Sequence, residues 1–327
     1  MTKSSFAGRE SLSRNLAANL GAYWVSVVIA FLISPFVIHT LGDARYGVWS
    51  LASELTSYYG LLDLGLRGAG SYFVAFYLAQ SEAKALRQSI ASAFWVLCGL
   101  GLVVLSVGLG LAVAFPYLFD TRGLEIDEIR LTLSIMSLLL AVSLPLEVLN
   151  SILTGMRRID LVSGVEVVTR VATAVAIYYV LRAGGGLVGL SLVSLSGRTV
   201  NWIIVAWVVR RLCGRGYLSP RHFRMGRLKE LAGYGLRNVA GQGAVFLTNR
   251  SGNLIIGFFM GVRWVTYYAI GQQVVSYAVE ACTTAAQAFT PHLAQLCARR
   301  EQDQLMRLYL AGLRVSGLLA VGLAAGL

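Results

Sequence analysis

Nine apolar stretches of membrane-spanning length, or nearly so, follow one another from Asn15 to Leu327. A helix needs about 20 mostly apolar residues to cross roughly 30 Å of hydrocarbon, whereas the strands of a membrane barrel have about ten residues that alternate in polarity. Stretches of this length are therefore typical of helices, which satisfy their own backbone hydrogen bonds in lipid. The sequence predicts an all-α protein, a polytopic membrane helix bundle of about nine spans.

The spans and the polar segments between them predict three parts of the chain. Residues 1–209 form an N-terminal six-helix membrane lobe, 210–230 a basic cytoplasmic linker, and 231–327 a partial second membrane lobe with three spans. The second lobe is expected to be incomplete, because the chain stops inside an apolar run; a fragment of a longer protein and a natively short product both remain open. The expected spans are 15–39, 46–78, 89–115, 129–155, 159–181, 186–209, 231–259, 264–289 and 305–327.

The distribution of Lys and Arg predicts how the chain is oriented. Seventeen of the 28 basic residues fall on one set of alternating loops and five on the opposite set. Because cytoplasmic loops carry the excess of basic residues, this bias puts the N-terminus of a multi-pass protein in the cytoplasm. The formal net charge of +12 then reflects topology, and nucleic acid is not expected as a partner.

The linker 210–230 is the longest polar interruption, with seven basic residues and one acid. A basic segment beside an anionic leaflet gains about 1 kcal/mol for each Lys or Arg near the surface. We expect it to lie on membrane lipids, partly as a short interfacial helix. The alternative is an ordinary basic loop, and both interpretations place the same boundary here.

Charged residues inside the apolar stretches are the second informative feature. Each would cost about 2.5 to 3.5 kcal/mol if it faced lipid at mid-depth, so these residues must face partners, water or the membrane edges. Asp63 with Arg67 and Glu166 with Arg170 have helical i, i+4 spacing and are expected to neutralise each other. The full set is Arg67, Arg170, Arg198, Arg237, Arg250 and Arg314, with Glu54, Asp63, Glu147, Glu166 and Glu280.

Three of these arginines, Arg198, Arg237 and Arg250, have no acid within reach on their own helices. Their presence favours a water-filled cavity inside the bundle. For Arg237 and Arg314 the alternative is a side chain that extends to the membrane interface along its apolar stem.

Polar side chains form stripes along the seventh and eighth predicted spans. At 100° per residue, the members of each stripe share one helix face. Hydrogen bonding between helices would explain either stripe alone, whereas stripes on two consecutive helices favour a hydrophilic cavity. The stripes consist of Asn238, Gln242, Asn249 and Asn253, and of Gln273, Ser276, Tyr277, Glu280, Thr284 and Gln287.

Motifs for catalysis or for cofactor binding do not emerge from the sequence. His39, His222 and His292 lie far apart, without the spacing of a zinc site. None of the three lysines follows a glycine, as the lysine of a phosphate-binding loop does. We therefore expect a protein that is not an enzyme, with no catalytic residue, no metal and no cofactor.

Short glycine and aromatic motifs lie near the first predicted loop and at the end of the seventh predicted span. They are Asn19, Pro35, Leu41, Gly42, Tyr46, Gly47, Trp49 and 62–66, and later 254–258, Gly261, Tyr267 and Tyr268. Their order, together with the basic linker after six spans, resembles that of the oligosaccharide flippases, or polysaccharide biosynthesis proteins, of the multidrug/oligosaccharidyl-lipid/polysaccharide (MOP) exporter superfamily. Many relatives carry an acid where this chain has Ser251, Gly252 and Asn253, so acid-dependent ion coupling at that place is not implied.

The resemblance implies a flippase of the bacterial inner (plasma) membrane that moves an anionic lipid-linked oligosaccharide between leaflets through a central cavity. Arg198 and Arg250 would then bind the diphosphate, because guanidinium groups bind phosphate in a bidentate manner. Glu54 and Asp63 are candidates for ion coupling. The expected contacts to sugar hydroxyls are Asn249, Asn253, Gln273 and Glu280.

Partners and rival functions complete the expectations. The resemblance implies a polysaccharide polymerase and a chain-length regulator as protein partners, besides the membrane lipids. A multidrug or cation antiporter of the same superfamily is the closest alternative. A membrane-embedded polymerase or glycosyltransferase is disfavoured, because the largest external loop, 116–128, is short. A non-transporting membrane fragment or subunit remains the third alternative.

Overall fold

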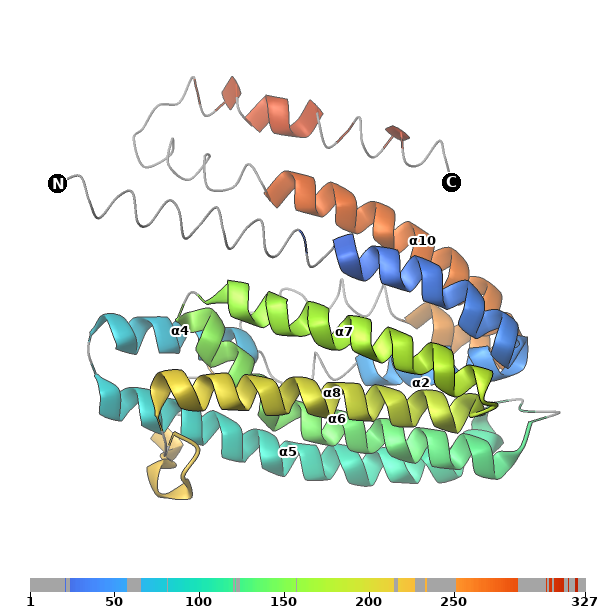
Figure 1. Cartoon of the computed structure of the whole chain (residues 1–327), viewed down its shortest axis with the longest axis horizontal. Helices are drawn as coiled ribbons and strands as arrows, with labels where there is room; N and C mark the ends of the chain where they lie inside the picture. The colour runs from blue at the N-terminus through green and yellow to red at the C-terminus, as the bar shows by residue number, and fades with distance from the viewer. Residues whose placement is uncertain are drawn as a thin grey trace. The chain divides into compact units, whose positions relative to one another are not determined.

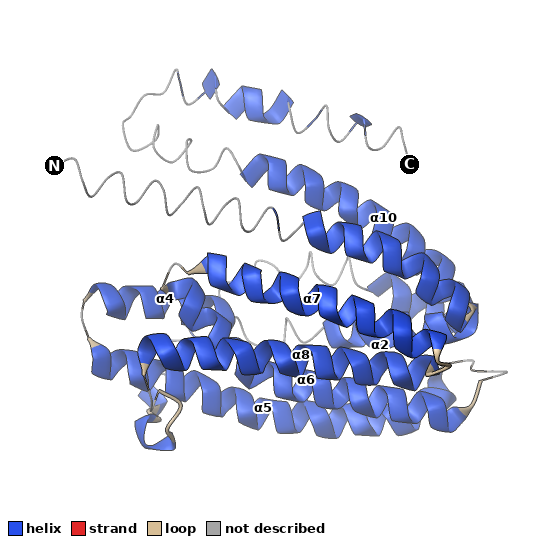
Figure 2. Cartoon of the chain, in the orientation of Figure 1, coloured by secondary structure: helices blue, strands red, loops and turns tan. Residues whose placement is uncertain are grey.

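The computed structural model of the chain describes residues 21, 24–57, 66–80, 82–119, 121, 124–156, 158–214, 217–226, 233, 251–287, 304, 306–307, 309–314, 317 and 321–322. Helices make up nearly all of this part, and it contains no strand (Figure 2). Met1–Thr266 and Tyr267–Leu327 form separate compact units. The all-α prediction is confirmed, while the domain boundary expected at 210–230 stays a prediction.

The helices agree with the predicted spans to within a few residues. The predicted span 46–78 is described as two helices, and positions 58–65 between them lie outside the described residues. α5 begins six residues before its predicted span, because Ala, Leu, Lys and Arg favour a helix whether or not they lie in lipid. The elements are Trp24–Leu41, α2 (Asp43–Ser57), α4 (Leu66–Ala79), α5 (Ala83–Leu118), α6 (Ile126–Gly155), α7 (Ile159–Arg182), α8 (Gly186–Cys213), η1 (Pro220–His222), Ser251–Met260 and α10 (Val262–Gln287).

Five of the described helices are long and apolar enough to cross a membrane: Trp24–Leu41, α5, α6, most of α7, and α8. Large apolar side chains cover their outer faces, and Phe31 and Leu102 are each 68% exposed. Monomeric soluble proteins rarely expose apolar surface on this scale. The chain is therefore a multi-pass membrane helix bundle. Most of the predicted spans 231–259 and 305–327 lies outside the described residues.

The packed interior of the first unit centres on α6, which contacts α4, α5, α7 and α8 (Figure 1). A Cβ atom placed on Gly101 of α5 would lie 2.5 Å from the carbonyl oxygen of Ala141 on α6. The missing side chain lets the two backbones approach closely, as is usual where membrane helices pack. The apolar cluster around this interface includes Phe73, Tyr77, Leu97, Leu149, Leu153 and Val205.

The segment after α8 folds back onto the first part of α5 (Figure 1). The Arg224 backbone N–H donates to Ser92 Oγ at 2.9 Å, and the Trp95 indole N–H donates to the Leu218 carbonyl at 3.0 Å. Arg87 lies over the Tyr217 ring, with its Cζ 5.3 Å from the ring centre. The described part of the predicted linker is thus held against the bundle, at the same end as the turns between α4 and α5 and between α6 and α7.

The opposite end of the first unit is closed by contacts between α2 and the start of α10. The Thr266 hydroxyl donates to the Asp43 carbonyl at 2.6 Å, and Arg263 Nε lies 3.7 Å from Asp43 Oδ2. A Cβ atom on Gly47 would overlap the Val262 carbonyl oxygen. Glycine at position 47 therefore allows the backbone of α10 to lie directly on α2.

Candidate functional site

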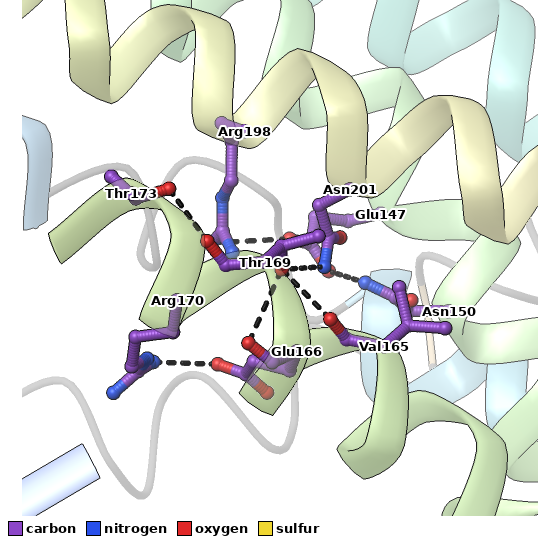
Figure 3. Close-up of polar contacts among 9 residues, drawn as sticks. All are labelled: Glu147, Asn150, Val165, Glu166, Thr169, Arg170, Thr173, Arg198 and Asn201. Atoms are coloured by element: carbon purple, nitrogen blue, oxygen red, sulfur yellow. Dashed lines mark hydrogen bonds and ion pairs between the residues drawn. The ribbon is translucent and has the colours of Figure 1, made fainter. Parts of the chain in front are cut away.

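A cluster of polar and charged side chains lies between α6, α7 and α8 (Figure 3). Arg198 of α8 points towards Glu147 of α6, and its Nη2 lies 3.6 Å from Glu147 Oε1. The second oxygen of Glu147 accepts a hydrogen bond at 2.9 Å from the Asn150 amide. The Glu147 side chain is 9% exposed and that of Arg198 is 40% exposed. A buried carboxylate thus anchors one side of a half-exposed guanidinium.

A second ion pair lies on α7. Arg170 Nη2 donates to Glu166 Oε1 at 2.6 Å, and the two side chains are 43% and 42% exposed. The i, i+4 pairing predicted for these residues is confirmed. The other predicted pair, Asp63 with Arg67, cannot be compared, because Asp63 and the Arg67 side chain lie outside the described residues.

Asn201 and Thr169 join α8 to α7 beside the two arginines (Figure 3). The Asn201 amide donates to Thr169 Oγ1 at 3.0 Å, while the Thr169 hydroxyl lies within hydrogen-bonding distance of the Val165 carbonyl one turn earlier. Both side chains are buried. Near them, a Cβ atom on Gly197 would overlap Thr173 Oγ1, so the two helices approach closely here. These contacts set the register in which α7 presents Arg170 and α8 presents Arg198.

The cluster borders a cavity of about 460 Å³ that is lined by helix Trp24–Leu41, α2, α6, α7 and α8. Its volume lies in the range of pockets that bind small molecules. One wall is polar and contains Arg170, Arg198, Glu166 and Asn201, and the facing walls include Trp49 and other apolar side chains. Glu147 is not among the lining residues. The charged groups at the cavity surface are thus two guanidinium groups and one carboxylate, and the carboxylate of Glu147 lies behind Arg198. An anion in the cavity can therefore reach the guanidinium donors directly.

The other predicted site residues lie elsewhere. Asn253 donates from its amide to Glu54 Oε2 at 3.3 Å, and the two residues are 4% and 5% exposed, so neither lines this cavity. In the second unit the Gln273 amide donates to the Tyr277 hydroxyl at 2.7 Å. Both residues belong to the polar stripe of the eighth predicted span. Outside the described residues lie Asp63, Asn249 and Arg250, and also the side chain of Glu280.

Sequence reasoning missed the partnership of Glu147 and Arg198, because it searched for acids within one helix. The sequence places both residues at membrane depth and gives Arg198 no acid on its own helix, and these two properties are the signal that points to a partner on another helix. Asn150, Thr169 and Asn201 do not belong to a polar stripe like those of the seventh and eighth predicted spans, so no signal in the sequence pointed to their contributions. Within the described ranges no three His, Cys, Asp or Glu side chains gather in a way that would hold a metal ion.

Comparison with known proteins identifies the family. Residues 68–327 match the family described as "Polysaccharide biosynthesis protein". The chain belongs to this family. A "Putative O-antigen transporter" of Shigella flexneri is 24% identical over 279 residues, which make up 81% of this chain and 62% of that protein. The chain thus spans less than two thirds of the length of this relative.

Solved structures with the same fold are MOP superfamily transporters. An inward-facing multidrug resistance MATE family transporter aligns with 96% of this chain and 69% of its own length, at 17% identity and a TM-score of 0.72. A MOP superfamily transporter from Pyrococcus furiosus aligns with 96% of this chain and 70% of its own length, at 16% identity and a TM-score of 0.64. This member of the polysaccharide biosynthesis family has the MOP transporter fold, as the resemblance implied.

Proposed function

We propose that this protein moves an anionic lipid-linked oligosaccharide from the cytoplasmic to the outer leaflet of the bacterial inner membrane. The observation that carries the proposal is the cavity of about 460 Å³ inside a membrane helix bundle, with Arg170 and Arg198 in its wall. The family and the MOP transporter fold support membrane transport as the general activity. Under this proposal the protein is a transporter that performs no covalent chemistry.

The physical problem of such transport is the polar headgroup. A diphosphate and sugar hydroxyls lose their hydration in hydrocarbon, and unpaired polar groups cost several kcal/mol there. A cavity with guanidinium, amide and hydroxyl groups replaces water, while the polyprenyl tail stays in lipid. Arginine suits this role because its planar fork offers two parallel hydrogen bonds to a phosphate.

The proposed residue roles follow from this chemistry. Arg198 and Arg250 bind the diphosphate, and Asn249, Asn253, Gln273 and Glu280 bind sugar hydroxyls. Asn253 reaches a substrate only after its hydrogen bond to Glu54 opens, which links sugar binding to a movement of α2 against helix Ser251–Met260. Glu54 and Asp63 remain the proposed groups for ion coupling.

The proposed setting of the protein in the cell follows from the basic loops and from the family. The N-terminus and the linker face the cytoplasm, where Arg221 and Arg224 lie beside the anionic leaflet. A polysaccharide polymerase and a chain-length regulator act on the product in the same membrane, and they are the proposed protein partners.

The test uses the full-length gene product in a bacterial strain that lacks its own flippase, with surface polysaccharide scored by gel. Arg198→Ala is compared with Arg182→Ala at equal expression. Arg182 is the matched control, because it lies at the end of α7, where its Cζ is 5.2 Å from the Tyr178 ring centre. We expect the parent and the Arg182→Ala variant to restore polysaccharide and the Arg198→Ala variant to fail. A parent that restores no polysaccharide but exports a cationic dye from the cell would replace the flippase by the antiporter.

A further inference from the structure

Two arginines on neighbouring helices share the wall of the cavity between α7 and α8. Arg170 and Arg198 are about equally exposed, at 43% and 40%, and both line the same space. The buried hydrogen bond between Asn201 and Thr169 holds the two helices together beside them. Two guanidinium groups are therefore presented to one cavity by a packed scaffold.

Most hydrogen-bond donors of these guanidinium groups are unused within the described part of the chain. A guanidinium has five N–H donors. Arg170 uses one of them, towards Glu166. The 3.6 Å between Arg198 Nη2 and Glu147 Oε1 exceeds the usual N–H···O length of about 2.7 to 3.2 Å, so that contact is an ion pair without a hydrogen bond. Both arginines can thus donate hydrogen bonds to a further anionic ligand.

The two carboxylates differ in how firmly they are held. Glu147 is buried behind Arg198, and Asn150 donates to its second oxygen. Glu166 is half-exposed, lines the cavity itself, and pairs with Arg170 within one helix. Solvent-exposed i, i+4 pairs contribute little to stability. Because Glu166 lines the cavity, its carboxylate faces water when Arg170 leaves it, whereas Arg198 stays oriented by the buried carboxylate of Glu147.

From this arrangement we propose that Arg170 and Arg198 together form a binding site for a phosphate or diphosphate group, with Glu166 as an exchangeable counter-ion. An entering diphosphate takes the guanidinium of Arg170 from Glu166 and bridges to the free donors of Arg198. Before the diphosphate enters, Glu166 and Glu147 compensate the positive charges of Arg170 and Arg198, which would be costly if they were unpaired at membrane depth. The inference rests on the proposed function, in which the diphosphate belongs to the lipid-linked substrate, and it adds Arg170 to the residues that bind it.

The direct test measures binding of inorganic pyrophosphate to the full-length protein in nanodiscs. Arg170→Gln and Arg198→Gln remove one guanidinium each, and Glu166→Gln removes the exchangeable counter-ion. Arg182→Gln is the control, because it removes an arginine of the same helix that does not line the cavity. Thermal unfolding of each variant in the nanodisc shows that it is folded.

We expect Arg170→Gln and Arg198→Gln each to weaken pyrophosphate binding by about tenfold or more, since hydrogen bonds to charged groups have this order of strength. Glu166→Gln should tighten binding several-fold, and Arg182→Gln should leave it unchanged. The proposal is overturned if folded Arg170→Gln protein binds both pyrophosphate and a prenyl diphosphate as the parent does, or if Glu166→Gln weakens binding. Arg170→Lys adds a geometric test: it keeps the charge but loses the fork, so binding should stay weaker than in the parent.

A prenyl diphosphate is the second probe and separates a lipid headgroup from a free phosphate compound. Binding that depends on Arg170 for the prenyl probe but not for pyrophosphate assigns the site to a lipid headgroup. The reverse pattern assigns it to a soluble phosphate compound.

The polysaccharide assay keeps this inference separate from the proposed function. If Arg170→Gln restores polysaccharide as well as the parent while Arg198→Gln does not, the paired site is wrong and the flippase stands. If both probes bind with the expected pattern but the parent restores no polysaccharide, the anion site stands and the flippase is wrong.

Discussion

Arg45 Nε lies 2.9 Å from Glu128 Oε2, while the other oxygen of Glu128 accepts a hydrogen bond at 3.1 Å from the backbone N–H of Leu187. A single carboxylate on α6 therefore contacts the first turns of both α2 and α8. The N–H groups in the first turn of a helix have no partner within the helix, and a negative charge there is favoured by the helix dipole. Glu128 thus caps α8 from a neighbouring helix.

We expect Glu128→Ala to lower the free energy of unfolding by about 1 to 2 kcal/mol, because a buried N–H of α8 loses its acceptor. Arg45→Ala should cost less than half of this amount, since the Arg45 side chain is 43% exposed and ion pairs of exposed side chains contribute little. Unfolding in mixed micelles provides the measurement for both variants. Equal losses in the two variants would show that the ion pair matters and the cap does not.

The close approach of α5 and α6 provides a second prediction with an internal control. Gly101→Ala places a methyl group against the Ala141 carbonyl oxygen and should destabilise the protein by about 1 to 3 kcal/mol. Gly99 lies on the same helix with open space around its Cβ position, so Gly99→Ala should be neutral or stabilise by up to about 1 kcal/mol. Thermal unfolding of both variants in one detergent separates packing from helix propensity, and similar shifts would contradict the packing explanation.

The hydrogen bond between Asn201 and Thr169 provides a third prediction. In a double-mutant cycle with Asn201→Ala and Thr169→Ala, the coupling energy should be about 0.5 to 1.5 kcal/mol, the range of hydrogen bonds between membrane helices. The measured quantity is the free energy of unfolding of the parent, both single variants and the double variant. A coupling near zero would mean that the register of α7 and α8 is set by apolar packing alone.

The buried contact of Glu54 with Asn253 provides a fourth prediction. Asn253→Asp places a second carboxylate beside Glu54 and should destabilise the protein by roughly 2 kcal/mol or more, because like charges are then buried together. Adding Glu54→Gln exchanges the two chemical groups and should recover most of that loss. Thermal unfolding of the single and the exchanged variants decides the matter: no recovery in the exchanged variant would show that the direct contact is not the cause.

Much of the fold follows from the length and spacing of the apolar stretches. The helices α5, α6, α7 and α8 lie where runs of about 20 apolar residues predict them, because a bilayer of fixed thickness demands that length. The glycine and aromatic motifs implied the family that residues 68–327 match. Arg198 was expected at a cavity, but among the contacts of the site only the pair of Glu166 and Arg170 was predicted, because one turn of a helix brings i and i+4 together whatever surrounds it.

The contacts between residues of different helices depended on how those helices pack. Asn201 meets Thr169 across 32 positions of the chain and Asn253 meets Glu54 across 199, and Arg198 finds its acid on α6. Helical periodicity gives the face of a helix on which a residue lies, but it does not say which neighbour that face meets. The sequence alone thus determined the spans, their likeness to a family and the pairing within α7. The tertiary structure decided which charges neutralise one another between helices, because that depends on the rotation and register of packed helices.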